Sequence, residues 1–250
     1  MNANQIGLQM YTLRSHTAQD MAGTLRQVAA MGYPSVELAG YGGLSVAEIG
    51  AVLSETGLRA MGAHVGYAQF DTRAAEVIAE LRTLGCEYSI VPSLPNEFRE
   101  DADQAKRAVE QFNRWATLCR DAGLRFAYHN HHFEFNPLGD GTLYDLIVNG
   151  TDPATVDLEV DAFWAHYAGV SPVAVIERLG QRASVIHLKD MAPGEHRADA
   201  PVGSGIMNWA DILAAGRAVG ARWYIVEQDH PQNPLADVET SLRYLQSVAQ

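Results

Sequence analysis

Four short segments of the chain end in residues that can bind a metal ion or transfer a proton. The segments are RFAYHNHHFEF (125–135), VDLEVDAFW (156–164), SVIHLKD (184–190) and WYIVEQD (223–229). Each contains a short apolar run of the kind found in a buried strand. In an α/β barrel the carboxyl ends of parallel strands converge on one face, which holds the active site. The pattern therefore predicts one cation bound by residues from four strand ends, namely Glu134, Asp161, His187 and Glu227.

The types of these residues favour a catalytic metal over a structural one. A set that mixes carboxylates with imidazole suits Mn²⁺, Zn²⁺, Co²⁺ or Fe²⁺; we expect Mn²⁺, with Mg²⁺ as a further alternative. Glu227 lies within the apolar run YIVEQ and needs a partner, because an unpaired buried charge is very costly. Taken singly, Asp161 also fits a helix cap and His187 a hydrogen-bonded core histidine. Thiolates are missing from all four strand ends, which disfavours structural zinc.

Other polar residues near the predicted strand ends are candidates for contacts with a substrate. Lys189 follows His187 by two residues, so both side chains point to the same face of a strand. Lys189 is therefore a candidate proton donor to a substrate oxygen, the alternative being a surface lysine. The remaining candidates are Glu37, His64, Trp164 and Arg197. Trp164 either stacks on a sugar ring or packs a loop, and Arg197 either contacts a phosphate or carboxylate or is solvated.

Strand-like and helix-like segments alternate along the whole chain. The strand-like segments are 6–13, 35–39, 59–65, 88–93, the start of 125–135, 156–160, 184–189 and 222–228. The helix-like segments are 17–31, 45–55, 71–84, 102–122, 142–148, 172–179, a segment from 208, and 234–248. Such alternation implies βαβ units and a parallel sheet, and eight units in about 250 residues have the size of a (β/α)₈ TIM barrel. We therefore predict one domain over residues 1–250. A doubly wound sheet would carry GxGxxG, which the chain lacks.

The amino-acid composition and net charge disfavour some classes of binding partner. The chain is 47% hydrophobic and 19% charged, with a formal net charge of −12, which disfavours a nucleic-acid partner because such a partner needs a basic face. The sequence has no apolar run long enough to span a bilayer and no basic and apolar leader of a secretory signal. Its two cysteines are too few for a disulfide scaffold. We expect a cytoplasmic protein with reduced thiols and no membrane partner.

The order and spacing of these segments resemble the sugar phosphate isomerase/epimerase superfamily, the xylose isomerase-like barrels that include inosose isomerases and dehydratases. The resembling pieces are IGLQMYTLR, SVELAGYGG, YHNHHFEF, LEVDAFW, VIHLKDM, VGSGIMNW and YIVEQD. The resemblance implies a divalent metal bound by Glu, Asp, His and Glu from the last four strands. Asp161, His187 and Glu227 match three of these positions. At the fourth position the chain departs from the pattern, because Tyr128 stands where the better-known epimerases have glutamate.

The departure leaves the fourth ligand open between Glu134, six residues after Tyr128, and His131. The YHNH run resembles the inosose dehydratase branch more than the ketohexose epimerases. Relatives of this kind are often dimers or tetramers, so the resemblance also implies a homo-oligomer.

Two catalytic functions and one non-catalytic function fit these residues. An isomerase or epimerase of a sugar, keto-sugar or cyclitol would abstract a proton next to a carbonyl and form an enediolate. Glu227 would be one base, and Glu134 or a histidine the other. A lyase acting on a keto-sugar, 3-keto-glycoside or inosose would use the same step and then expel a hydroxyl, with His131 or Lys189 as the acid. A sugar-binding barrel without activity is the remote alternative.

Overall fold

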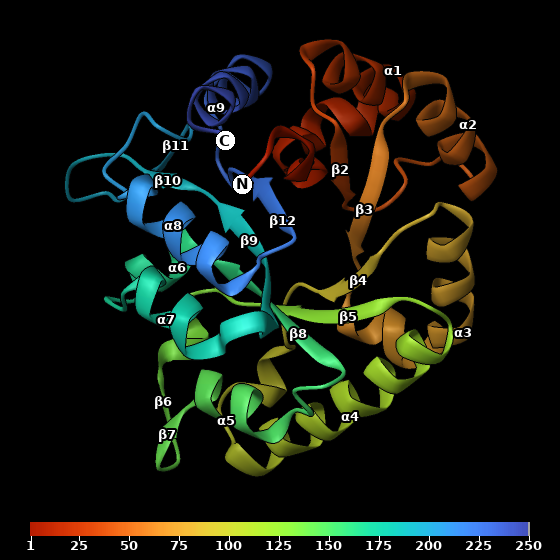
Figure 1. The fold of residues 1–250 in the computed structure, drawn as a ribbon. Coiled ribbons are helices and arrows are strands. Elements are labelled where there is room, and N and C mark those ends of the chain that lie inside the picture. The colour runs from red at the N-terminus through yellow and green to blue at the C-terminus, as the bar shows by residue number, and fades with distance from the viewer. Residues whose placement is uncertain (250) are drawn as a thin grey trace.

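Eight parallel strands close into a barrel within residues 1–249, the part of the chain that the computed structural model describes (Figure 1). The barrel strands are β1 (Ile6–Gln9), β2 (Ser35–Leu38), β3 (Arg59–His64), β4 (Tyr88–Val91), β5 (Arg125–His129), β8 (Val156–Asp161), β9 (Ala183–Leu188) and β12 (Trp223–Val226). Their order around the barrel is β1-β12-β9-β8-β5-β4-β3-β2. The pairing of β1 with β12 closes the barrel, and the predicted (β/α)₈ architecture is confirmed.

Helices surround the barrel and connect its strands (Figure 1). They are α1 (Arg14–Met31), α2 (Val46–Thr56), α3 (Tyr67–Thr83), α4 (Ala102–Asp121), α5 (Leu143–Gly150), α6 (Ala162–Tyr167), α7 (Pro172–Leu179), α8 (Trp209–Val219) and α9 (Pro234–Val248). Among the described residues, no helix is both long enough and apolar enough to span a membrane.

The structure differs from the sequence prediction mainly where the loops leave the carboxyl ends of the strands. The first strand ends at Gln9, and residues 10–13 form a 3₁₀ helix. The sequence analysis gave no helix after β8 but noted that Asp161 fits a helix cap. The helix α6 begins there, because the Asp161 carboxylate accepts a hydrogen bond from the Trp164 N–H at 2.8 Å and caps the first turn. Two short hairpins were also not predicted, β6 (Pro137–Leu138) with β7 (Gly141–Thr142) and β10 (Asp190–Met191) with β11 (Asp199–Ala200).

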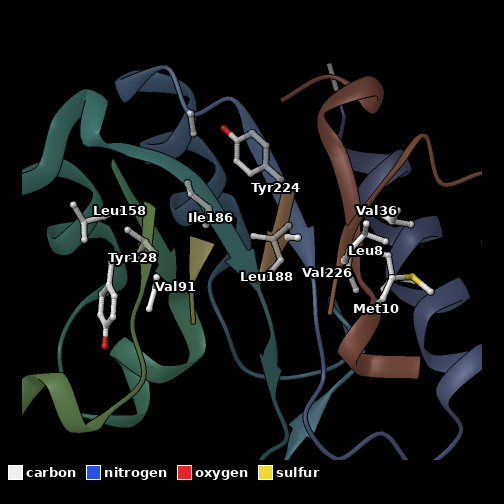
Figure 2. Close-up of a cluster of buried hydrophobic side chains, with 14 of the residues drawn as sticks. Leu8, Met10, Val36, Val91, Tyr128, Leu158, Ile186, Leu188, Tyr224 and Val226 are labelled. Carbon is white, nitrogen blue, oxygen red and sulfur yellow. The ribbon is translucent and has the colours of Figure 1, made fainter. Parts of the chain in front are cut away.

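Alternation along the strands produces two separate apolar layers. A small cluster fills the barrel interior and consists of Met61, Tyr88, Ile90, Ala127, Val185, Trp223 and Ile225. The larger cluster packs between the sheet and the helices, and Figure 2 draws part of it, including Leu8, Tyr128 and Ile186. Because side chains alternate along a strand, His129, His187 and Glu227, two positions after the interior residues Ala127, Val185 and Ile225, also point inward. The interior cluster therefore packs directly beneath the polar residues at the strand ends.

A buried carboxylate fixes the long loop after β9. Asp190 accepts hydrogen bonds from the N–H groups of Met191, Gly203, Gly205 and Met207 and from Trp209 Nε1, at 2.7–3.0 Å. A second carboxylate, Asp199 of β11, accepts the N–H groups of Asp229 and His230. The loop after β9 is thereby attached to the segment that follows β12.

We expect Asp190→Ala to lower the melting temperature by about 6–12 °C. The substitution leaves several buried N–H donors without an acceptor, at a loss of at least about 3 kcal/mol of the free energy of unfolding, and in a chain of this size about 1 kcal/mol corresponds to roughly 2–4 °C. Calorimetry of the variant beside Asp140→Ala, an exposed loop aspartate, measures the effect. Equal melting temperatures for the two variants would contradict this role of Asp190.

Candidate active site

A cavity of about 420 Å³ opens at the carboxyl ends of the barrel strands. Its walls are Tyr11, Ala39, His64, Pro92, Ser93, His129, His131, Trp164, Glu227, Asp229 and His230. These residues come from loops or strand ends that are far apart in the sequence. A concave site with a few convergent polar groups at this face is the usual location of a TIM-barrel active site.

Two imidazoles and two carboxylates meet beside this cavity, and we call them the outer group: His129, Asp161, His187 and Glu227. Two of the four, His129 and Glu227, line the cavity. They come from β5, β8, β9 and the residue after β12, and each offers one donor atom within 4.8 Å of the others. Nδ1 of His187 lies 3.0 Å from Glu227 Oε2, and Nε2 of His129 lies 3.9 Å from Asp161 Oδ2. All four residues are at most 4% exposed. This set of donors could hold a divalent metal ion.

Lys189 lies beside the outer group and is completely buried. Its Nζ is 3.2 Å from Asp161 Oδ2, 3.1 Å from Glu227 Oε2 and 2.7 Å from Asp229 Oδ2. Although burial alone would lower it, these three carboxylates raise the pKa of Lys189 well above its ordinary value. Burial likewise opposes the charge on Glu227, but Lys189 and His187 hold the pKa of that carboxyl well below its usual range. Both groups are therefore charged at neutral pH.

A second set of donors lies one layer deeper in the barrel, and we call it the inner group: His64, His129, Glu159 and His187. Glu159 precedes Asp161 by two residues on β8, so it points to the same interior one layer below. Its Oε2 is 2.8 Å from His64 Nε2 and 2.9 Å from His129 Nδ1, and its Oε1 is 3.2 Å from His187 Nε2.

Glu37 adjoins the inner group from β2. Its Oε2 is 2.8 Å from His187 Nε2 and accepts a hydrogen bond from Gln9 Nε2 at 2.7 Å. Burial, together with the nearby charge of Glu159, raises the pKa of Glu37 to about 7. Burial lowers the pKa of His187, but the carboxylates of Glu159 and Glu37 outweigh it and leave that pKa well above the ordinary value. His187 thus links both groups in the absence of a metal.

The sequence analysis left the fourth ligand open between Glu134 and His131, whereas the structure brings His129 together with Asp161, His187 and Glu227. The Tyr128 side chain belongs to the cluster between the sheet and the helices (Figure 2). Its ring centroid is 5.1 Å from that of Phe112 on α4. Strand alternation could have identified His129 as an inward-pointing residue. Ala127 belongs to the interior cluster, and the residue two positions later on the same strand also points inward. The same rule identifies Glu159 from Asp161.

Glu134 lies away from both groups. Its Oε1 accepts a hydrogen bond from the Tyr128 hydroxyl at 2.5 Å, and its Oε2 accepts the His131 N–H at 2.8 Å. The residue is fully buried in the short 3₁₀ helix Phe133–Phe135. Burial raises the pKa of Glu134 to about 7, although the hydrogen bonds from Tyr128 and from the His131 backbone act in the opposite direction. This arrangement points to a carboxyl that fixes the loop after β5.

The raised pKa of Glu134 predicts a pH-dependent contribution to stability. The folded chain binds this proton more tightly than the unfolded chain, whose ordinary pKa is 4.5. The stabilisation is therefore fully present below about pH 4.5 and lost as the pH rises through about 7. Between these limits, we expect the free energy of unfolding of Glu134→Gln to rise by about 3 kcal/mol relative to that of the wild type. Chemical denaturation at a series of pH values measures the difference, and parallel curves for the two proteins would exclude the effect.

The other sequence candidates fall into two places. His131 and Trp164 line the central cavity, with their ring centroids 5.8 Å apart, and burial lowers the pKa of His131 to about 2, so this imidazole is neutral. Arg197 lies elsewhere: its Nη1 donates to the Tyr167 carbonyl at 3.0 Å, and it lines a separate surface hollow with Ile206. The structure thus brings most of the candidates together at the cavity or in the donor groups beside it, but leaves Glu134 and Arg197 outside both.

Comparison with known proteins identifies the family. Residues 25–248 match the sequence model of the family described as xylose isomerase-like TIM barrel, and the chain belongs to this family. An inosose dehydratase of Geobacillus kaustophilus is 25% identical over 201 residues, which are 72% of this chain and 64% of that protein. An inosose dehydratase of Clostridium beijerinckii is 25% identical over 104 residues, 40% of this chain and 33% of that protein. The chain therefore matches less than two thirds of the length of these curated relatives.

Solved structures share the fold over nearly the whole chain. A sugar phosphate isomerase/epimerase from Parabacteroides distasonis superposes with a TM-score of 0.86 at 28% identity, covering 99% of this chain and 95% of that one. A D-psicose 3-epimerase superposes with a TM-score of 0.75 at 16% identity, covering 98% of this chain and 99% of that one. At that lower identity the likeness concerns the fold.

Proposed function

We propose that the protein is a metal-dependent isomerase that removes a proton next to the carbonyl of a sugar, keto-sugar or cyclitol. The observation that supports this most strongly is the outer group, where two imidazoles and two carboxylates from four strands meet, with His129 and Glu227 in the cavity wall. The names of the relatives support the same class of substrate, since they are inosose dehydratases and a sugar phosphate isomerase/epimerase.

The donor set of the outer group fits a divalent ion. Asp161 uses Oδ1 to cap α6, while Oδ2 faces Lys189 and His129. Each imidazole has its other nitrogen hydrogen-bonded to a carboxylate of Glu159 or Glu37, as is common for metal-binding histidines. Mn²⁺ is our first choice among Mn²⁺, Zn²⁺, Co²⁺, Fe²⁺ and Mg²⁺. A bound ion would polarise the substrate carbonyl and acidify the neighbouring C–H.

Glu227 is the proposed base. It is ionised, it lines the cavity, and Lys189 and His187 fix its carboxylate in place. Lys189 balances the charge of the site, and its ammonium is the proposed proton donor to a substrate oxygen. Trp164 and the neutral imidazole of His131 also line the cavity, where they would contact the sugar face and its hydroxyls.

The position of Glu134 favours a reaction that needs one carboxylate base. Epimerisation requires proton transfer on both faces of the enediolate, whereas isomerisation can use a single base that moves the proton between adjacent carbons. Glu134, the second base suggested by the sequence, is bonded to Tyr128 and does not line the cavity among the described residues. Isomerisation therefore fits these side chains better than epimerisation through two glutamates.

Dehydration is a second candidate reaction, because it also needs only one carboxylate base. A lyase needs one base and one acid that protonates the departing hydroxyl. Glu227 and Lys189, 3.1 Å apart, provide such a pair. The relatives named inosose dehydratase also favour this reaction.

The cavity favours a substrate without phosphate. In the part of the chain that the structure describes, its wall contains no arginine or lysine but two carboxylates, Glu227 and Asp229. Lys189 is held by three carboxylates, and Arg99, the guanidinium behind Ser93, donates to Ser93 Oγ and the Leu94 carbonyl. A phosphate would therefore meet two carboxylates and no free arginine or lysine in the wall described. A free sugar should compete for the site more strongly than the same sugar carrying a phosphate.

The test is proton exchange in deuterated water with ketoses and inososes, followed by NMR and ultraviolet absorption. An isomerase incorporates deuterium without loss of water, whereas a lyase gives an unsaturated product that absorbs in the ultraviolet. Absence of exchange in the metal-loaded protein across these sugars would overturn both reactions and leave the sugar-binding barrel.

A further inference from the structure

The two donor groups at the strand ends are stacked and share their imidazoles. His129 presents Nδ1 to Glu159 Oε2 at 2.9 Å and Nε2 to Asp161 Oδ2 at 3.9 Å. His187 presents Nδ1 to Glu227 Oε2 at 3.0 Å and Nε2 to Glu159 Oε1 at 3.2 Å. Each ring therefore has one nitrogen in the outer group and one in the inner group. Neither ring has to rotate for either group to bind an ion.

The inner group has the composition and spacing of a metal site in its own right. It combines three imidazoles with one carboxylate, from four different strands. Donor atoms around a tetrahedral ion with bonds of about 2.0–2.1 Å lie about 3.4 Å apart. The nitrogen–oxygen distances around Glu159 are 2.8, 2.9 and 3.2 Å, so small shifts of the side chains would open the space needed.

Glu37 adds an independent observation. The residue is completely buried, and its Oε1 has no hydrogen-bond partner within residues 1–249. Its Oε2 is already 2.8 Å from His187 Nε2 and 3.5 Å from His64 Nε2. A buried carboxylate oxygen without a partner is costly, and a cation in the inner group would provide one. Glu37 thus stands as a further carboxylate donor next to the four residues of the inner group.

We infer that the inner group is a second cation position for Zn²⁺, Co²⁺, Fe²⁺ or Mn²⁺, and that it alternates with the outer position. An imidazole that binds an ion through one nitrogen keeps its proton on the other and donates it to a carboxylate. An ion in the outer position therefore leaves Glu159 and Glu37 as hydrogen-bond acceptors, and an ion in the inner position leaves Asp161 and Glu227 in that role. Filling both would require both rings to lose both protons.

The inner position would hold an ion away from the proposed base. His64 and His129 of the inner group line the cavity, but the carboxylates Glu159 and Glu37 are fully buried and do not belong to its wall as described for residues 1–249, whereas Glu227 does. A chain with its ion in the inner position is therefore loaded but at rest, and movement of the ion outward gives the form with Glu227 beside it. This inference goes beyond the proposed function, and its test measures metal binding alone.

The decisive variant combines Asp161→Asn with Glu227→Gln, which removes both carboxylates of the outer group. We expect this variant to bind one Co²⁺ per chain, with a dissociation constant within about tenfold of the wild-type value, by metal analysis and visible absorption. Addition of His64→Gln should then weaken binding at least 100-fold. His64→Gln alone should still bind one ion, in the outer position. His196→Gln, an exposed loop histidine, is the matched control.

Loss of Co²⁺ from the double variant, with an unchanged circular dichroism spectrum, would overturn the inference and make the inner group a support for the outer one. Two ions bound to the wild-type chain would overturn the alternation. If the double variant does not fold, Asp161→Asn alone replaces it, and the cobalt spectrum must then change while one ion stays bound. A wild-type chain that binds its ion yet exchanges no sugar proton would contradict the proposed function and not this inference.

Discussion

Glu227→Gln should lower kcat by about 10²–10⁴-fold while leaving the fold intact. The substitution keeps the shape of the side chain but removes the negative charge that would accept the substrate proton, and general-base catalysis accounts for about this factor. The amide also loses the charge that attracts Lys189, 3.1 Å away. Steady-state kinetics with the sugar that shows the fastest deuterium exchange, together with metal analysis of the same sample, measure the effect.

The matched control is Glu177→Gln, an exposed glutamate on α7, which should keep wild-type turnover. Near-normal turnover of Glu227→Gln with its metal in place would remove Glu227 from the chemistry. Loss of metal without recovery at high metal concentration would show that the main role of Glu227 is to bind the metal. The base would then have to be one of the histidines of the cavity wall.

The second large effect is expected at the fourth ligand position, where His129→Gln should weaken metal binding by more than about 10²-fold. His129 belongs to both donor groups, and substitution of residues that merely support ligands already costs about 10–100-fold. Glu134→Gln should retain the metal, because Glu134 is bonded to Tyr128 and the His131 N–H. Titration of both purified variants with Mn²⁺ or Co²⁺ gives the comparison.

Glu134→Gln also serves as the control for damage to the loop after β5, since it lies five residues from His129 on the same segment. The reverse outcome, metal lost from Glu134→Gln and kept by His129→Gln, would restore Glu134 as the ligand. It would also mean that the loop rearranges when metal binds.

The barrel and most of its site were predictable because the residues that mark a strand end lie next to one another in the sequence. The runs VDLEVD, SVIHL and WYIVE each place a polar residue where an apolar strand stops, and the structure brings Asp161, His187 and Glu227 together. The fourth position stayed open between Glu134 and His131 because YHNHH offers several polar residues in succession. There the answer depends on which one shares the inward face with Ala127, and hence on the register of β5 within the closed barrel.

Other parts of the site depend on contacts between distant segments, and no local pattern reveals them. Glu159 was overlooked within VDLEVD because its partners, His64 and His129, come from other strands. The role of Glu134 depends on the hydroxyl of Tyr128, which the barrel wall turns toward α4. Asp190 looked like a further strand-end acid, and only the fold of residues 203–209 around it shows that it organises a loop.

The bonds from Asp199 to Asp229 and His230 have a consequence for protein engineering. A graft that replaces only the loop after β9 would remove Asp199 and with it these hydrogen bonds to the segment after β12. Because Asp229 also binds Lys189, the graft would then release the Lys189 ammonium from one of its three carboxylates. Segments 190–207 and 228–231 should therefore be treated as one structural unit when loops are exchanged. A designer who wants a new substrate range on this scaffold should exchange the two together and leave the β3–β5 side of the mouth untouched.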